Sequence, residues 1–134
     1  VINAHQQIIK TKLDTMVQHI TEPVKIEAAG TGGKVIKEFF GRVNTRDEKI
    51  SIAQMESPAG WGEPGQKPQF DEYTLVLNGT LKVETKSGTF LAGAGEAILC
   101  PKNEWVRYST PDGAKYLAVC LTAFSPETVH RDAQ

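Results

Sequence analysis

Two side chains in the stretch from Gly60 to Gly79 could act together on a bound molecule, namely the amide of Gln66 and the carboxylate of Glu72. They are six residues apart, so an extended strand places both on one face. Burial raises the pKa of a carboxyl group unless a cation or hydrogen-bond donors compensate, which makes Glu72 a candidate general acid or base. The adjacent Asp71 also allows a simpler interpretation, in which Glu72 is a solvated carboxylate at the start of a strand.

The strand that carries Glu72 is apolar on both faces. Alternation places Phe70 on the same face as Gln66 and Glu72, and places Tyr73, Leu75 and Leu77 on the opposite face. An antiparallel strand with one solvated face should alternate more clearly between polar and apolar residues. We therefore expect the second face to be covered, either by a helix of this chain or by a second copy in a homodimer.

Short strands and turns dominate the rest of the chain. Residues 4–20 repeat apolar side chains at helical spacing and predict one amphipathic helix, after which strand-like runs separated by Gly and Pro continue to residue 124. The pair Asn78-Gly79 between two such runs predicts a hairpin that joins strands 72–77 and 80–85, with positive φ at Gly79. This pattern is typical of an all-β jelly roll in a single domain spanning residues 1–134, with the barrel at about 24–124 and a short C-terminal arm at 125–134.

The spacing of the turn residues resembles the two sequence motifs of the cupin family. Gly60, Gln66-Lys67-Pro68, Glu72 and Gly79 fit the first motif, and Gly95, Pro101, Asn103, Val106 and Thr110 fall on the second. The family has histidines where this chain has Gln66, Pro68 and Val106. The resemblance therefore implies the double-stranded β-helix of the cupin jelly-roll barrel without the usual metal ligands. It is also similar to the ethanolamine-utilization cupins, which likewise lack that ligand set.

The resemblance implies where a site would lie. In the cupin pattern the face of Gln66 and Glu72 lines the barrel, as does Val106, and alternation then turns Tyr108 inward. We expect catalytic roles for Glu72, Tyr108 and Gln66, and ligand contacts from five further residues: Met55, Trp61, Phe70, Val106 and Cys120. Trp61 has an alternative as an ordinary packing residue, because Trp is highly buried on average.

The residues at the cupin ligand positions predict no bound metal, because imidazole provides most of the transition-metal affinity of such sites. Glu63, Gln66 and Glu72 could at most hold a hard, partly hydrated cation. Glu63 itself is expected to be a solvated charge at the barrel mouth. A cavity with Glu72 as its charged group would favour a neutral or cationic small molecule over an anion.

Composition excludes several classes of partner. Fifteen basic and 16 acidic residues, a net charge of -1, provide no basic stripe for nucleic acid. No apolar run is long enough to cross a membrane, and the start of the chain has no signal-peptide pattern. Two cysteines, Cys100 and Cys120, lie in apolar runs, which favours a cytoplasmic protein with free thiols, although the sequence leaves a disulfide between them open.

These observations support three functional hypotheses. The first is a metal-independent small-molecule-binding cupin that uses Glu72 as acid or base and needs no cofactor. The second is a non-catalytic dimeric module that only recognises a ligand. The third is a divergent metal-dependent enzyme that uses Glu63, Gln66 and Glu72. Fold alone does not choose among them.

Overall fold

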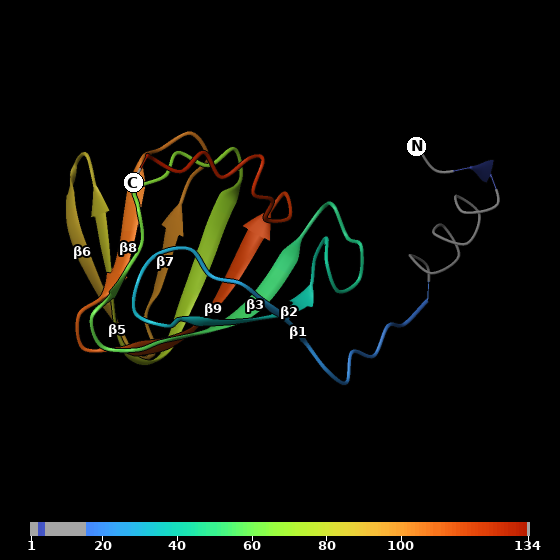
Figure 1. The fold of residues 1–134 in the computed structure, drawn as a ribbon, viewed down its shortest axis with the longest axis horizontal. Helices are drawn as coiled ribbons and strands as arrows, with labels where there is room; N and C mark the ends of the chain where they lie inside the picture. Colours follow the sequence, from blue (N-terminus) through green and yellow to red (C-terminus); the bar gives the residue numbers. More distant parts are fainter. Residues whose placement is uncertain (1–2, 5–15, 134) are drawn as a thin grey trace.

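The computed structural model describes residues 3, 4 and 16–133, and these form nine antiparallel strands (Figure 1). The strand bounds are β1 Val24–Ile26, β2 Val35–Phe40, β3 Ser51–Ser57, β4 Trp61–Gly62, β5 Asp71–Thr85, β6 Gly88–Gly93, β7 Ala97–Cys100, β8 Val106–Thr110 and β9 Ala114–Leu121. The predicted all-β jelly roll is confirmed. The predicted helix over 4–20 falls mostly outside the described residues, and within it residues 16–20 are not helical.

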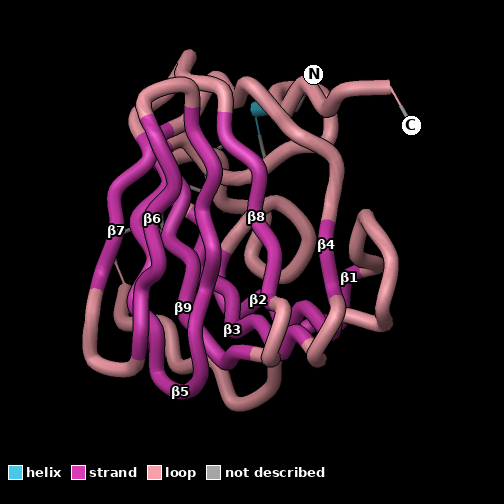
Figure 2. Tube along the Cα trace, turned by 90° about the vertical axis from the view of Figure 1, so that its left-hand side faces the viewer, coloured by secondary structure: helices cyan, strands magenta, loops and turns pink. Residues whose placement is uncertain are grey.

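The strands form two layers that share β5. One layer has the order β1-β2-β3-β9-β5-β7, and the other has the order β6-β5-β8-β4. The first half of β5 pairs with β7 and β9, and its second half pairs with β6 and β8. Figure 2 shows how the strands curl around one interior. Because β5 crosses between the layers, its inward side chains reach the whole length of that interior.

The hairpin predicted at Asn78-Gly79 is wrong, because β5 continues through these residues as one 15-residue strand. Asn78 and Gly79 both pair with β9, opposite Lys115 and Ala114, after a register shift that follows Val76. Gly79 does have positive φ, at 76°. The positive φ bends the strand from one layer into the other instead of reversing it, because partner strands continue on both sides of the bend.

The interior holds an apolar core with a smaller cluster beside it. The larger cluster contains Trp61, Val76, Leu81, Val83, Ala92, Cys100, Val106, Tyr108 and Tyr116. The smaller one contains Phe70, Cys120 and Val129, with Phe124 packed against it. Along β5, Thr74 and Val76 are buried, as the alternation from Gln66 predicts. Leu81 and Val83 are buried as well, because the register shift after Val76 changes which positions point inward.

The C-terminal arm runs beside residues 65–69 and closes one side of the barrel. Backbone N–H groups of Lys67 and Gln69 donate to the carbonyls of His130 and Thr128, at 3.2 and 2.9 Å. The indole N–H of Trp105 donates to Asp132 at 2.9 Å. This pairing fixes the position of residue 131 relative to the barrel. Among the described residues, no helix has the length and apolar character required to cross a membrane.

The outer face of the larger layer exposes large apolar side chains over adjacent strands. Tyr73 is 42% exposed and Leu75 is 43% exposed on β5, and Leu99 and Leu121 are similarly exposed on β7 and β9. Tyr73 lies opposite Leu99 and Val119 in the strand pairing, so these residues form one continuous outer apolar face. We propose that a second copy of the chain covers this face, because contiguous apolar area of this kind is uncommon on monomers.

We expect light scattering at micromolar concentration to give twice the 14.7 kDa mass of the chain. Replacing Leu75 with Lys should produce a monomer, because a charge would then be buried in the contact. The matched control is Leu91→Lys on β6, which is 67% exposed but lies on the other layer and should remain dimeric. A monomeric wild type would contradict the proposal.

Candidate functional site

A cavity of about 70 Å³ lies inside the barrel, and it contains several of the residues singled out in the sequence. Its lining comprises Ile26, Glu27, Ala28, Ala29, Lys34, Ile36, Glu38, Ser51, Ala53, Met55, Glu63, Gln66, Glu72, Ala118, Cys120, Phe124 and Arg131. The lining therefore has apolar walls and a small group of charged side chains. A cavity of this size accommodates a molecule of only a few heavy atoms.

Glu72 lies on β5 between the two cysteines, with Cys100 opposite it on β7 and Cys120 opposite it on β9. The thiol of Cys120 donates to Oε1 of Glu72 at 3.8 Å, which is a weak interaction. Burial, together with the charge of Glu63, raises the pKa of Glu72 to about 7, although Lys34, the hydrogen bond from Cys120 and Arg131 oppose the shift. The carboxyl group is therefore poised to gain and lose a proton near neutral pH.

The two cysteines are free thiols, and the strand between them keeps them apart. Two strand spacings amount to roughly 10 Å, which exceeds the Cα separation that a disulfide can span. Burial raises the pKa of both thiols, and the neighbouring charge of Glu72 raises them further. Neither cysteine is therefore a thiolate nucleophile at neutral pH.

Glu63 forms an ion pair inside the barrel, so the expectation of a solvated mouth charge is wrong. Its side chain is 7% exposed, and Arg131 Nη1 lies 3.1 Å from its Oε2. The same Nη1 donates to Oε1 of Gln66 at 2.7 Å. Burial raises the pKa of Glu63, and the charges of Lys34 and Arg131 oppose that shift. Glu63, Gln66 and Arg131 thus form a charged network that the C-terminal arm completes.

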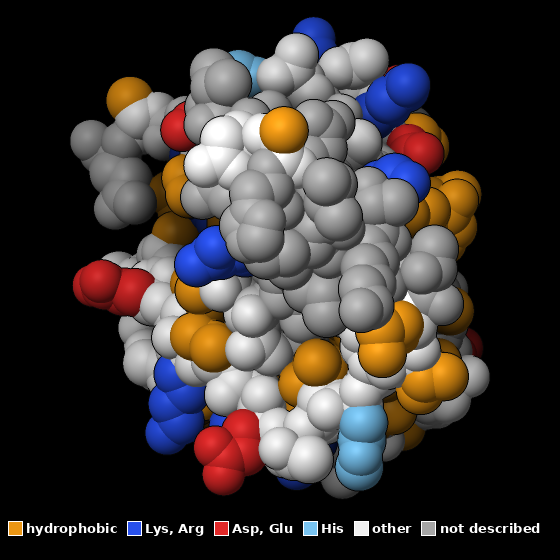
Figure 3. All heavy atoms as spheres, turned by 90° about the vertical axis from the view of Figure 1, so that its right-hand side faces the viewer, with side chains coloured by type: hydrophobic (Ala, Val, Ile, Leu, Met, Phe, Trp, Pro, Cys, Tyr) orange, Lys and Arg blue, Asp and Glu red, His pale blue; other side chains and the backbone are white. Residues whose placement is uncertain are grey.

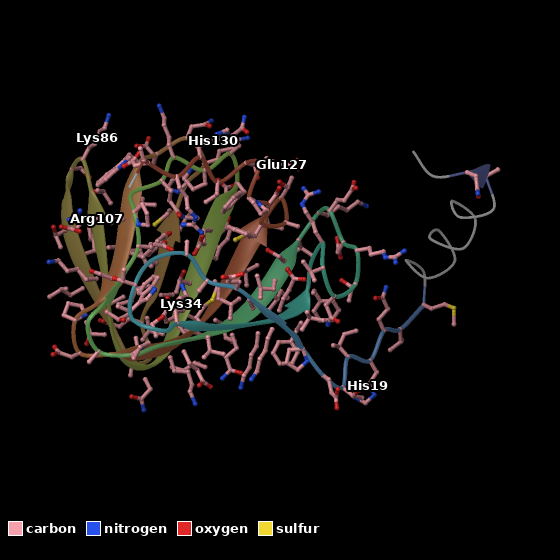
Figure 4. The ribbon with its side chains drawn as sticks, viewed as in Figure 1. His19, Lys34, Lys86, Arg107, Glu127 and His130 are labelled. Carbon is pink, nitrogen blue, oxygen red and sulfur yellow. The ribbon has the colours of Figure 1, made fainter. Side chains whose placement is uncertain are left out.

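Lys34 is the second cation of the cavity. It directly precedes β2 and follows a glycine-rich loop whose Thr31 pairs with Gly62 of β4. Its ammonium lies 4.1 Å from the centre of the Trp61 ring and 5.3 Å from that of Tyr116. In Figure 4 Lys34 lies beside the loop that crosses the barrel, whereas Arg107 lies at the outer end of the sheet.

The structure brings some of the predicted site residues to the cavity and places others in the packed core. Gln66, Glu72, Met55 and Cys120 line the cavity. The other four predicted residues, Trp61, Phe70, Val106 and Tyr108, belong to the core clusters and are each at most 4% exposed. The roles of Trp61, Phe70 and Val106 as ligand contacts and of Tyr108 as a catalytic residue stay predictions.

Tyr108 lies in the core with a hydroxyl group that has no hydrogen-bond partner. The indole N–H of Trp61 is also buried without a partner. Burial raises the pKa of Tyr108, and the charge of Glu72 raises it further. Tyr108 is therefore a neutral phenol that neighbours Glu72 and the thiol of Cys100.

Glu38 also lines the cavity, but its carboxylate belongs to the fold. Its Oε2 accepts hydrogen bonds from the backbone N–H groups of Val43 and Asn44, at 3.0 and 2.8 Å. These bonds hold the turn that follows β2 and satisfy the buried charge. Glu38 is thus not available to a ligand in the way that Glu72 is.

Sequence reasoning missed Lys34 and Arg131, the two cations of the site. Both come from segments outside the strand pattern, namely a glycine-rich loop and the C-terminal arm. Only the folded chain brings them within reach of Glu63 and Glu72. No local spacing signal marks either residue.

Comparison with known proteins identifies the fold. A sequence model of the family described as "Ethanolamine utilisation protein EutQ" matches residues 65–125. A solved RmlC-like cupin from Shewanella frigidimarina aligns with a TM-score of 0.68 and 12% identity, covering 84% of this chain and 97% of that chain. The chain has the cupin fold. The polyketide cyclase RemF of Streptomyces resistomycificus aligns with a TM-score of 0.69 and 17% identity, over 90% of this chain and 87% of that chain.

Two curated relatives are longer than this chain. "Endoribonuclease YbeY" of Myxococcus xanthus is 40% identical over 103 residues, which are 75% of this chain and 35% of that protein. "Acetate kinase EutQ" of Salmonella typhimurium is 33% identical over 54 residues, which are 40% of this chain and 24% of that protein. The chain therefore spans about a third or less of the length of these relatives.

The residues at the usual cupin metal positions do not fit a transition metal. Pro68 and Val106 have no donor atom on their side chains, and the Oε1 of Gln66 already accepts from Arg131. Across residues 3, 4 and 16–133, no cluster of three or more His, Cys, Asp or Glu side chains could hold a metal ion. The described side chains of the cavity therefore do not form a transition-metal site.

Proposed function

We propose that this cupin binds a small molecule in the cavity and transfers a proton to or from it through Glu72, without a transition metal. The observation that carries the proposal is the environment of Glu72. It is a cavity-lining carboxyl group with a pKa raised to about 7 by burial, and the thiol of Cys120 donates only a weak hydrogen bond to it. Structural carboxylates are held differently, as the two backbone donors to Glu38 show.

The neighbours of Glu72 support this role. Arg131 holds Glu63 and Gln66 in place, so that the charged wall of the cavity is rigid. The Tyr108 hydroxyl is a neutral hydrogen-bond donor in the core behind Glu72. A general acid or base near neutral pKa, held in a dry site, typically contributes 100-fold to 10,000-fold to a rate.

Deuterium exchange tests the proposal with simple carbonyl compounds in place of the natural substrate. We expect the wild type in D₂O to accelerate exchange of the C–H protons of two such probes, pyruvate and acetone, as followed by NMR. Glu72→Gln should lower the enzyme-dependent rate by about 100-fold or more. The control Glu56→Gln removes a partly exposed carboxylate that pairs with Lys37 and Lys115, and it should leave the rate unchanged.

Two outcomes would contradict the catalytic part of the proposal. One is exchange that survives in Glu72→Gln, which would place the acid or base elsewhere. The other is binding of the probes without any enzyme-dependent exchange, which would favour the non-catalytic binding module. The third hypothesis, metal dependence, predicts a different result for the wild type. Exchange would then require an added divalent metal ion, with Glu63, Gln66 and Glu72 as its ligands.

The charge of this chain does not favour RNA as its partner. Binding to RNA requires phosphate neutralisation by Lys and Arg. This chain has 15 basic and 16 acidic residues. On the described part of the face in Figure 3, basic and acidic side chains are interspersed with apolar ones. We propose a small metabolite as the partner and the cytoplasm as the location, the latter because both cysteines are free thiols.

A further inference from the structure

The charged groups of the cavity differ in how well they are neutralised. Arg131 is paired with Glu63, and Glu38 has its own backbone donors. Glu27 is exposed, so solvent screens its charge. Lys34 contacts aromatic rings, and within the described residues no carboxylate lies within ion-pair distance of its ammonium. Lys34 and Glu72 are therefore the two charged groups of the cavity that a ligand can still engage.

We propose that Lys34 binds the carboxylate of a small monocarboxylic acid, whose apolar body lies in the cavity with its other end toward Glu72. The proposal rests on the proposed function, since it assigns a ligand class to the same cavity. It replaces the expectation of a neutral or cationic ligand, which took Glu72 to be the charged group of the cavity. An ammonium on an aromatic wall is a suitable anchor for one carboxylate, because the rings exclude water without neutralising the charge.

The affinity of the cavity for the anion depends on whether Glu72 is protonated. With Glu72 neutral, Lys34 is the cation of the cavity that has no carboxylate within ion-pair distance, and a monoanion supplies that partner. With Glu72 ionised, a second negative charge lies in the same cavity as the ligand carboxylate. The other groups that face Glu72 are the thiols of Cys100 and Cys120 and the phenol of Tyr108, which are all neutral at these pH values. Binding should therefore be coupled to uptake of one proton.

Size and wall composition also favour a short carboxylic acid. The cavity of about 70 Å³ has Ile36, Ala53 and Met55 among its apolar walls. A hollow of about 340 Å³ adjoins the cavity along residues 25–36. Ile26 and Lys34 line both the hollow and the cavity. A ligand can thus approach along the glycine-rich loop and meet Lys34 first.

Three probes of equal size and different charge test the ligand class, namely propionate, propionamide and n-propylammonium. The readout is the indole N–H signal of Trp61 in a ¹⁵N-¹H correlation spectrum, because Lys34 lies against that ring. The chain has two tryptophans, so the Trp105→Phe variant removes one indole signal and thereby assigns both. In the wild type, the signal of Trp105, whose indole N–H donates to Asp132, is the internal reference. We expect propionate at pH 6 to shift the Trp61 signal to saturation and to leave the Trp105 signal in place. Propionamide and n-propylammonium should bind at least tenfold more weakly.

Two variants and a pH series then test the named residues. Lys34→Met should weaken propionate at least tenfold, and Lys34→Arg should restore most of the affinity. The matched control is Lys37→Met on β2, three residues after Lys34. The Lys37 ammonium lies 3.7 Å from Glu56, and this variant should bind like the wild type. Wild-type affinity should fall several-fold from pH 6 to pH 8, whereas Glu72→Gln should keep its pH 6 affinity at pH 8.

The outcomes separate this inference from the proposed function. If n-propylammonium or propionamide shifts the Trp61 signal and propionate does not, the cavity binds small molecules but the assignment of a carboxylate to Lys34 is overturned. Propionate affinity that is unchanged in Lys34→Met also overturns it. If none of the three probes shifts the signal, both the inference and the binding role of the cavity fail.

Discussion

Glu72→Gln is expected to raise the free energy of unfolding at pH 8 by up to about 3 kcal/mol and to leave it nearly unchanged at pH 4. The reason is that burial raises the pKa of Glu72 from 4.5 to about 7. Above pH 7 the folded protein holds a buried charge with weak compensation, and the amide of Gln removes that charge while keeping the shape. Urea unfolding of wild type and variant at pH 4, 6 and 8 measures the difference.

The sign of the pH dependence follows from where the proton is held. Between pH 4.5 and 7 the folded state keeps a proton on Glu72 that the unfolded state has released. The contribution of this group to stability is therefore complete below pH 4.5 and is lost as the pH rises through 7. Glu63 also has a raised pKa, but its replacement would leave Arg131 without a partner, so it is a poorer probe.

The control for this experiment is Glu56→Gln, because Glu56 is a partly exposed carboxylate on β3 with two lysine neighbours. Its effect should be small and nearly independent of pH. A Glu72→Gln variant that shows the same change in stability at pH 4 and pH 8 would mean that Glu72 does not titrate near neutrality in the folded protein.

The sequence predicted the strands and the inward face well. The apolar runs 24–26, 35–40 and 97–100 each predict a short strand, and these are the bounds of β1, β2 and β7 in the structure. Alternation from Gln66 correctly placed Thr74 and Val76 in the interior and Tyr73 outside. These features depend on local pattern, which a sequence displays directly.

The electrostatics of the site could not be predicted in the same way. Lys34 and Arg131 are 97 positions apart in the sequence, and neither belongs to a strand. Their approach to Glu63 and Glu72 depends on the loop that pairs at Gly62 and on the arm that pairs at Gln66. Such contacts carry no periodic signal, so the sequence alone underestimates the positive charge in the cavity and leaves Glu63 in solvent.

Asn78-Gly79 shows a different limit of sequence reasoning. The dipeptide correctly indicated positive φ at Gly79. It did not indicate whether the chain reverses there, because that depends on which strands lie alongside. In this fold β9 pairs through the bend and β6 takes over after it, so one strand serves both layers.

Gly79→Ala is expected to lower the free energy of unfolding by about 3 kcal/mol or more. Alanine at the φ of 76° found for Gly79 costs about 1 kcal/mol in backbone conformation. A Cβ at this position would also overlap the carbonyl oxygen of Gly113 and lie 2.9 Å from the Cα of Ala114. Both are backbone atoms of the facing turn and strand, so relief requires a shift of the pairing between β5 and β9. Urea unfolding at one pH measures the total effect.

Gly95→Ala provides the matched control, because Gly95 has a φ of 82° and a Cβ built there meets no atom within 4 Å. This variant should lose only the conformational part, about 1 kcal/mol. The difference between the two variants isolates the contact with Gly113. In a hairpin tip the side chain of residue 79 would point into open space, and the two substitutions would then cost the same. Equal losses would therefore contradict the corner geometry that carries β5 from one layer to the other, whereas a loss at Gly79 larger by about 2 kcal/mol would support it.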